Sequence, residues 1–136
     1  MKYWLIPCDS KKFRVHDYFA NNQIVDWKQS HYKFEIGDIV FIYCSAPEAE
    51  IRYMLEVAQP NISYDNSIDD EEYWGDKHMS KAAAMQNKYV RLHLLETINP
   101  NELDIISLKN NGLIKAPQGA QKISGNLLSF ILSKCN

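Results

Sequence analysis

The chain has 136 residues, a hydrophobic content of 46% and a formal net charge of −2 at pH 7. These values predict one folded domain over residues 1–136 and exclude wholesale disorder. The mildly acidic balance argues against a protein that binds nucleic acid through net charge alone, because such proteins are usually basic. Three widely spaced cysteines predict no disulfide framework and a reducing, cytoplasmic location.

The first part of the chain alternates strand-like and helix-like segments. Residues 2–7 (KYWLIP) predict a strand and are too short for a signal-peptide core or a membrane span, so no membrane association is expected. Residues 13–22 predict a short amphipathic helix, and Trp27 follows in a polar segment that we expect to be a loop. After a turn at Gly37, residues 39–44 (IVFIYC) form a continuous apolar strand, which is typical of a closed barrel or a covered sheet.

The middle of the chain contains two segments with the period of two that indicates strands. Residues 51–59 alternate in this way, and Pro60 is expected to end that strand. Residues 88–98 alternate as well, with Val90 pointing to the core. The polar stretch between the two strands is acidic and predicts a short helix at residues 81–86.

Two helices are expected near the C-terminus. The first covers residues 102–109, and the second covers residues 125–134 with an apolar stripe and Ser124 as its N-cap. Short strands with inserted helices predict an α+β fold built on a small curled sheet or barrel flanked by short helices.

Charge is distributed unevenly along the chain. Residues 48–76 carry nine acidic residues and one basic residue, whereas residues 77–136 carry eight basic and three acidic residues. This pattern predicts either one acidic and one basic face, or a solvated acidic loop with scattered lysines.

The sequence has no motif typical of metal, phosphate or cofactor binding. Its four histidines are not at ligand spacing, no CxxC pair occurs, and the five glycines form no phosphate loop. We therefore expect no metal, no cofactor and no catalytic residue. One catalytic alternative pairs the Cys8 thiol with His16 or His31, although cysteines at strand ends are usually packing residues.

Aromatic residues occupy unusual places outside the apolar pattern. Trp27 follows the first helix, Trp74 lies in the acidic stretch, and Tyr43 is near the end of the strand over residues 39–44. Together these rings could build a cage for a flat ligand. Equally, each tryptophan could cover the open end of a small core.

Several segments, taken in order, resemble the EVE domain of the PUA-like superfamily, whose relatives include YTH, ASCH and SRA-type domains. They are KYWLIP, VDWKQS, GDIVFIYCS, IRYMLEVAQ and LKNNGLIKAPQGAQKISGNLLSFI, and the resemblance extends from Lys2 to about Leu132. It implies a single EVE/PUA-like domain with a curled β-barrel of five or six strands flanked by helices.

The resemblance also implies a function. It implies a non-enzymatic reader that holds a flipped modified base, with a modified cytosine in DNA favoured, that serves restriction of foreign DNA, and that works with a separate nuclease or methyltransferase. A module for modified RNA is the alternative. Carried over by position, the base pocket is lined by Pro7, Cys8, Asp9, Ser10, Trp27, Lys28, Gln29, Ser30, Tyr43, Cys44, Ser45 and Trp74. Phosphate contacts are expected from Lys11, Lys12, Arg14 and Lys122.

Overall fold

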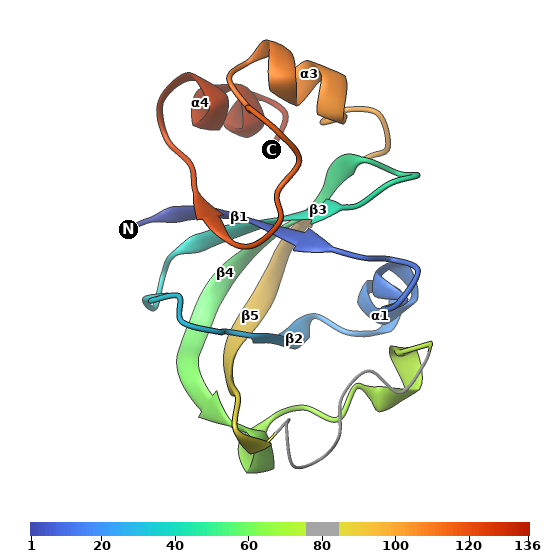
Figure 1. Cartoon of the computed structure of the whole chain (residues 1–136), viewed down its shortest axis with the longest axis vertical. Coiled ribbons are helices and arrows are strands. Elements are labelled where there is room, and N and C mark those ends of the chain that lie inside the picture. The colour runs from blue at the N-terminus through green and yellow to red at the C-terminus, as the bar shows by residue number, and fades with distance from the viewer. Residues whose placement is uncertain (76–84) are drawn as a thin grey trace.

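The computed structural model describes residues 1–75 and 85–136, and these form one mixed six-stranded sheet with helices on both faces (Figure 1). The strands are β1 (Tyr3–Cys8), β2 (Ile24–Lys28), β3 (Ile39–Cys44), β4 (Glu50–Ser63), β5 (Lys88–Thr97) and β6 (Gln121–Lys122). Their order in the sheet is β2-β5-β4-β3-β1-β6. Strands β1 and β3 are parallel, and the other neighbours are antiparallel.

The helices of the described part are α1 (Val15–Asn21), α3 (Ile105–Asn110) and α4 (Gly125–Ser133), with 3₁₀ turns η1 (Tyr64–Asn66) and η2 (Glu71–Tyr73). The three predicted helices are therefore confirmed, each shorter than expected. Ser124 occupies the N-cap position of α4 without a side-chain hydrogen bond to the helix. The helix expected at residues 81–86 lies mostly outside the described residues. None of the described helices has the length and apolar character needed to cross a bilayer.

The α+β prediction is confirmed, but the sheet does not close into a barrel. Within the described residues β2 and β6 are its two edges and do not pair with each other. Closure requires the first and last strands to form a ladder, and β6 is a two-residue strand at the far edge from β2. The long strands β4 and β5 instead curve across the molecule and curl the open sheet (Figure 1).

Strands β2 and β6 were not predicted, and β4 is longer than expected. Trp27 belongs to the edge strand β2, where it pairs with Val90 of β5, and not to a loop. Strand β4 continues past Pro60, which was expected to end it. Pro60 lies between Gln59 and Ile62, where the register with β5 shifts, and at such an irregularity a residue without an N–H group is tolerated.

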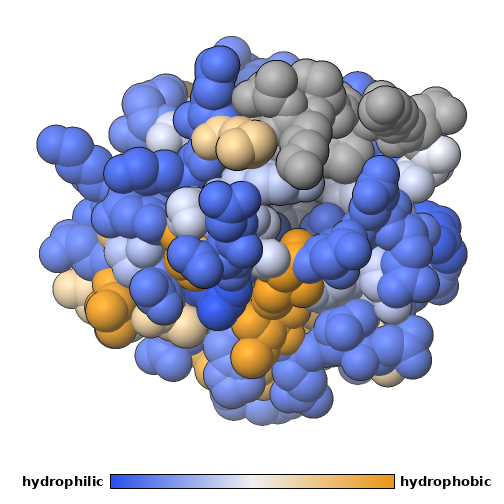
Figure 2. All heavy atoms as spheres, turned by 90° about the horizontal axis from the view of Figure 1, so that it is seen from below, coloured by the Kyte–Doolittle hydropathy of each residue, from blue (hydrophilic) through white to orange (hydrophobic). Residues whose placement is uncertain are grey.

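The sheet is covered on both faces by apolar clusters. One cluster contains Val40 and Ile42 of β3 together with Tyr18 of α1. The other contains Phe41 of β3 and Ile131 of α4. This two-sided burial explains why β3 is apolar without alternation, and it confirms the covered-sheet interpretation. The face seen in Figure 2 is mostly hydrophilic, with a compact hydrophobic area.

Candidate functional site

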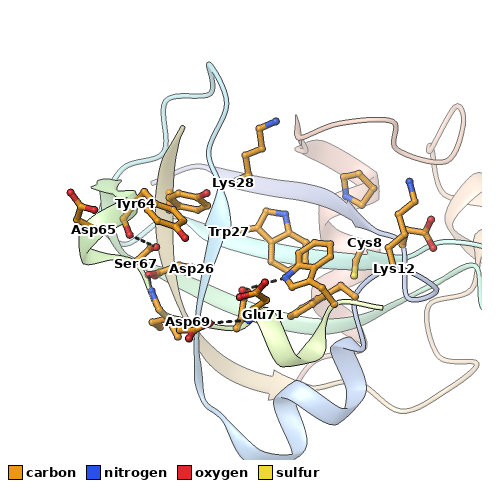
Figure 3. A pocket seen from close by; sticks show the side chains of 17 residues that line it. Cys8, Lys12, Asp26, Trp27, Lys28, Tyr64, Asp65, Ser67, Asp69 and Glu71 are labelled. Carbon is orange, nitrogen blue, oxygen red and sulfur yellow. Dashed lines mark hydrogen bonds between the residues drawn. The ribbon is translucent and has the colours of Figure 1, made fainter. Parts of the chain in front are cut away.

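A cavity of about 790 Å³ opens beside β2, which is a volume typical of small-molecule sites (Figure 3). Its walls come from the end of β1, the turn that follows β1, strand β2, the acidic segment with η1 and η2, and one residue of β5. The lining residues are Pro7, Cys8, Asp9, Lys12, Phe13, Asp26, Trp27, Lys28, Tyr64, Asp65, Ser67, Ile68, Asp69, Asp70, Glu71, Trp74 and Tyr89.

An aromatic group forms one wall of this cavity. The half-buried Trp27 contacts Phe13 edge to face, with ring centroids 5.9 Å apart. Phe13 in turn packs against Trp74 at 4.8 Å, and the backbones of these two residues form an isolated bridge. The Trp74 indole N–H donates to Asp70 Oδ1 at 3.2 Å. Phe13 is thus the buried support on which both indoles rest, and it fixes them as walls of one cavity.

A buried ion pair ties the acidic segment to the sheet. Asp26 of β2 has a side chain that is only 2% exposed, and Arg91 of β5 donates to both of its oxygens, at 2.9 and 2.8 Å. The hydrogen bonds to Asp26 raise the pKa of the Arg91 guanidinium. Asp26 Oδ2 also accepts the backbone N–H of Ile68 at 2.8 Å. The carboxylate therefore holds the chain around residue 68 against the edge strand that carries Trp27.

The cavity is mostly acidic, since its lining contains two lysines, Lys12 and Lys28, and six carboxylate residues, one of which, Asp9, shares the turn of Lys12. Lys12 lies at the β1 end, whereas Asp65 and Asp69 lie at the opposite end (Figure 3). Lys28 extends from β2 beside Trp27, and Glu71 lies below the rings in the same view. Ionised carboxylates only accept hydrogen bonds, while lysines only donate them. A ligand that matches this site therefore presents hydrogen-bond donors to the carboxylates and keeps any anionic group close to Lys12 and Lys28.

The structure brings half of the predicted pocket residues together. Six of the twelve line the cavity: Pro7, Cys8, Asp9, Trp27, Lys28 and Trp74. The six that do not line it are Ser10, Gln29, Ser30, Tyr43, Cys44 and Ser45.

Local packing explains most of these exclusions. The side chain of Tyr43 belongs to the apolar cluster on the other face of the sheet. Gln29 is buried and bonds to Asn61 through both ends of its amide, at 2.9 and 2.8 Å. Cys44 is fully buried behind the cavity wall, and Ser45 donates its backbone N–H to the Cys8 carbonyl. These residues hold the scaffold in place and do not face the cavity.

Of the residues predicted to contact phosphates, some lie at the cavity and others do not. Lys12 lines the cavity, and its exposed neighbour Lys11 follows the same turn. Arg14 is engaged elsewhere, because it donates to Asp17 at 3.1 Å and to the Glu72 carbonyl at 2.6 Å. Lys122 of β6 lies over the Trp4 ring, outside the cavity.

Sequence reasoning missed the supports of the cavity. Phe13 was expected to lie in the helix over residues 13–22, and no sequence pattern marked Tyr64 or Tyr89 as residues that line the cavity. The Asp26–Arg91 pair joins residues 65 positions apart, so no local spacing could reveal it. The acidic run was visible, but nothing in the sequence indicated that it folds back against β2.

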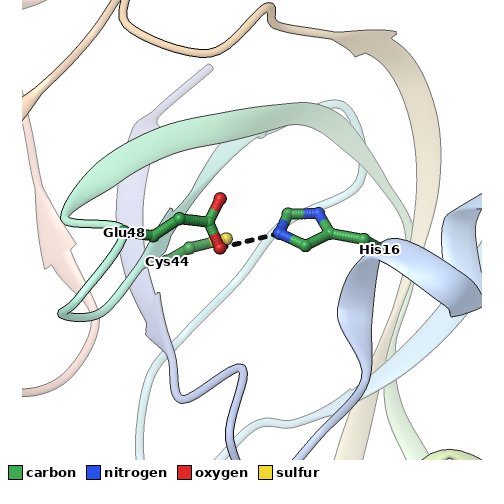
Figure 4. A group of neighbouring side chains, drawn as sticks. All are labelled: His16, Cys44 and Glu48. Atoms are coloured by element: carbon green, nitrogen blue, oxygen red, sulfur yellow. Dashed lines mark hydrogen bonds and ion pairs between the residues drawn. The ribbon is translucent and has the colours of Figure 1, made fainter.

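The thiol environment does not favour nucleophilic catalysis by Cys8. Burial, with smaller contributions from Asp9 and Glu48, raises the pKa of Cys8 to about 12, so the thiol is protonated at neutral pH. His16 bonds instead to Glu48, with 2.7 Å between Nε2 and Oε1 (Figure 4). Its Nδ1 atom bonds to the Tyr53 hydroxyl. His31 is exposed and stacks on Tyr32.

No family model and no curated protein sequence matches the chain. Solved structures do match it over nearly its whole length. The ASCH protein of Zymomonas mobilis has a TM-score of 0.65 and 11% identity, covering 97% of this chain and 94% of that one. A hypothetical protein from Leishmania major has a TM-score of 0.66 and 18% identity, covering 98% and 93%.

Human THYN1, solved in complex with DNA containing 5-methylcytosine, has a TM-score of 0.64 and 13% identity and covers 98% of this chain and 96% of its own. At these identities the likeness concerns the fold. The likeness therefore supports the expected α+β architecture, whereas the PUA-like and EVE assignments stay predictions. The chain shares its α+β fold with the ASCH protein and THYN1, and in this chain the fold is an open curled sheet flanked by helices.

Proposed function

We propose that this chain is a non-enzymatic, EVE-type reader domain that binds nucleic acid and holds a flipped modified base, a modified cytosine in DNA, in the cavity beside Trp27. The observation that carries the proposal is the half-buried Trp27 ring in the wall of a cavity of about 790 Å³. The shared fold with THYN1, which was solved with DNA containing 5-methylcytosine, supports the choice of ligand.

The energetics of base flipping define what the cavity must supply. Extruding a base costs a few kcal/mol in lost stacking and pairing. Stacking on one aromatic ring returns about 1–3 kcal/mol. Trp27 alone therefore only offsets the cost, and contacts to the base edge must provide the remaining affinity. Trp74, on the other side of Phe13, is the second apolar surface that the cavity offers.

The positions of the carboxylates and of the two lysines in the cavity set the orientation of the ligand. Cytosine presents an exocyclic amino group that donates hydrogen bonds, and Asp and Glu are its usual acceptors. Asp65, Asp69 and Glu71 offer such acceptors along the acidic wall. The phosphates must then lie at the other end, near Lys12 and Lys28, because the carboxylates repel them. A cytosine nucleotide, with an amino group on its base and a phosphate on its sugar, satisfies both requirements.

Burial of a methyl group adds about 0.8 kcal/mol, which corresponds to roughly fourfold in affinity. The test is therefore a titration with two DNA oligonucleotides that differ only in methylation of one central cytosine, with tryptophan fluorescence as the signal. Trp4 is buried and hydrogen-bonded to Asp38, so it provides a constant background. We expect quenching by both oligonucleotides, with at least fourfold tighter binding of the methylated one.

Equal affinity for both oligonucleotides would contradict selective reading, and no quenching by either would contradict nucleic-acid binding at this site. A matching RNA that binds more tightly than the DNA would support the RNA alternative, since a protein distinguishes RNA through its 2′-hydroxyls. The Trp27→Phe variant, which keeps a flat ring at the same position, is the matched control for the origin of the signal.

A further inference from the structure

A second group of side chains converges outside the cavity, at the end of the β1–β3 pair. Its members are His16 of α1, Cys44 at the end of β3 and Glu48 in the turn after β3 (Figure 4). One nitrogen, one sulfur and one oxygen atom from these three residues lie within 4.8 Å of one another. Cys44 and Glu48 belong to the end of β3 and the turn after it, whereas His16 belongs to α1, so only the tertiary structure completes the group.

We propose that His16 Nε2, Cys44 Sγ and Glu48 Oε1 form a site for a divalent zinc ion. Zinc binds histidine nitrogen, thiolate sulfur and carboxylate oxygen at about 2.0–2.3 Å in tetrahedral geometry. Tetrahedral bonds of that length place ligand atoms about 3.3–3.6 Å apart. His16 Nε2 and Glu48 Oε1, which lie 2.7 Å apart, would separate by about 0.6 Å on binding, and ligand atoms up to 4.8 Å apart would approach by about 1.2 Å. Three protein ligands leave the fourth position for water.

The partners around the group have the arrangement expected of an outer shell. The other ring nitrogen of His16, Nδ1, lies 2.5 Å from the Tyr53 hydroxyl. If Nδ1 carries the ring proton and donates it in a hydrogen bond to this hydroxyl, Nε2 is unprotonated and can bind the ion. Arg52 donates to Glu48 Oε2 at 3.1 Å, so Oε1 is the oxygen left for the ion. Each of these two ligands is thus oriented by a hydrogen bond from its far side.

The charges around the group and its exposure to solvent are both compatible with a divalent cation. The Arg52 guanidinium lies 3.1 Å from Glu48 and 3.9 Å from Glu50. With Cys44 as a thiolate, three negative charges balance the charges of Arg52 and a divalent cation. Cys44 is fully buried, but the side chains of His16 and Glu48 are 39% and 24% exposed, which gives an ion a route from solvent.

The test uses Co²⁺ as a spectroscopic substitute for zinc, titrated into the reduced full-length protein. We expect one equivalent to produce a near-ultraviolet thiolate-to-cobalt charge-transfer band and the intense visible bands of four-coordinate Co²⁺, and we expect Zn²⁺ to remove both. Cys44→Ser should lose the charge-transfer band. Cys135→Ser, a thiol remote from the group, is the matched control and should behave as the wild type.

Because Cys44 is fully buried, its replacement can also disrupt folding. Glu48→Gln, on the partly exposed turn, is therefore the second variant. We expect it to weaken Co²⁺ binding at least tenfold while circular dichroism shows an unchanged fold. Tyr53→Phe, which removes the outer hydrogen bond, should weaken binding by about tenfold. Absence of a charge-transfer band in the wild type would overturn the proposal. A band that survives in folded Cys44→Ser but disappears in Cys8→Ser would overturn this ligand set.

Discussion

Replacement of Trp27 by alanine tests the proposed base site most directly. The change removes the ring from the wall of the cavity and leaves the lysines and carboxylates in place. Loss of one base–aromatic stack costs about 1–3 kcal/mol, and each 1.4 kcal/mol is about tenfold in affinity. We therefore expect roughly 5- to 150-fold weaker binding of the methylated oligonucleotide.

The assay is fluorescence anisotropy of a dye-labelled oligonucleotide, since the substitution removes one of the intrinsic fluorophores. Trp27 also contacts Phe13 edge to face at 5.9 Å and is half-buried, so the variant should lose about 2 kcal/mol of stability as well. Phe130→Ala is the matched control, because Phe130 packs on the cluster at the other face of the sheet. It should lose stability without losing affinity.

The reasoning fails if folded Trp27→Ala binds within twofold of the wild type. It also fails if Phe130→Ala weakens binding as strongly as Trp27→Ala does, because the loss would then reflect stability and not stacking. Urea unfolding of both variants supplies the necessary comparison of stability.

Three further predictions concern charge and the thiols. Arg91→Ala leaves the buried Asp26 carboxylate without its cation, so urea unfolding should show a loss of about 2–3 kcal/mol; an unchanged midpoint would contradict the assigned role of the pair. Lys28→Gln should reduce the slope of log affinity against log salt by about one, and a parallel plot for wild type and variant would exclude a phosphate contact. Cys8, with its pKa raised from 9.0 to about 12, should alkylate far more slowly in the folded protein at pH 8 because its thiolate fraction is about a thousandfold lower. Mass spectrometry of iodoacetamide-treated protein checks this, and equal rates in folded and urea-unfolded protein would refute it.

The proposed reader and the proposed zinc site are adjacent but independent. Cys8 lines the cavity, and its register partner across the parallel ladder is Cys44, a proposed zinc ligand. Loss of base binding in Trp27→Ala and loss of Co²⁺ binding in Glu48→Gln therefore report on two sites that share one strand pair. Each can fail without the other.

Periodicity along the chain was sufficient to predict most of the secondary structure. The continuous apolar run of β3 and the alternation of β5 were recognisable because burial on one or two faces imposes those patterns. The short strand β2 was missed because Asp26 and Lys28 flank Trp27 and resemble a polar loop. In the structure that carboxylate is buried by Arg91, a partner that no local pattern could supply.

The candidate sites likewise contain some residues that were predicted from the sequence and others that only the tertiary structure brings together. The predicted pocket residues came from the resemblance to the EVE domain, and those near the ends of β1 and β2 that line the cavity are Pro7, Cys8, Asp9, Trp27 and Lys28. Tyr43 follows the alternation of β3, which places it with Phe41 on the face covered by α3 and α4, away from the cavity. His16, Cys44 and Glu48 lie at no ligand spacing in the sequence, and only the packing of α1 against the end of β3 brings them together. Sequence alone determines local burial and period, whereas contacts between distant segments depend on how the sheet curls and which faces its helices cover.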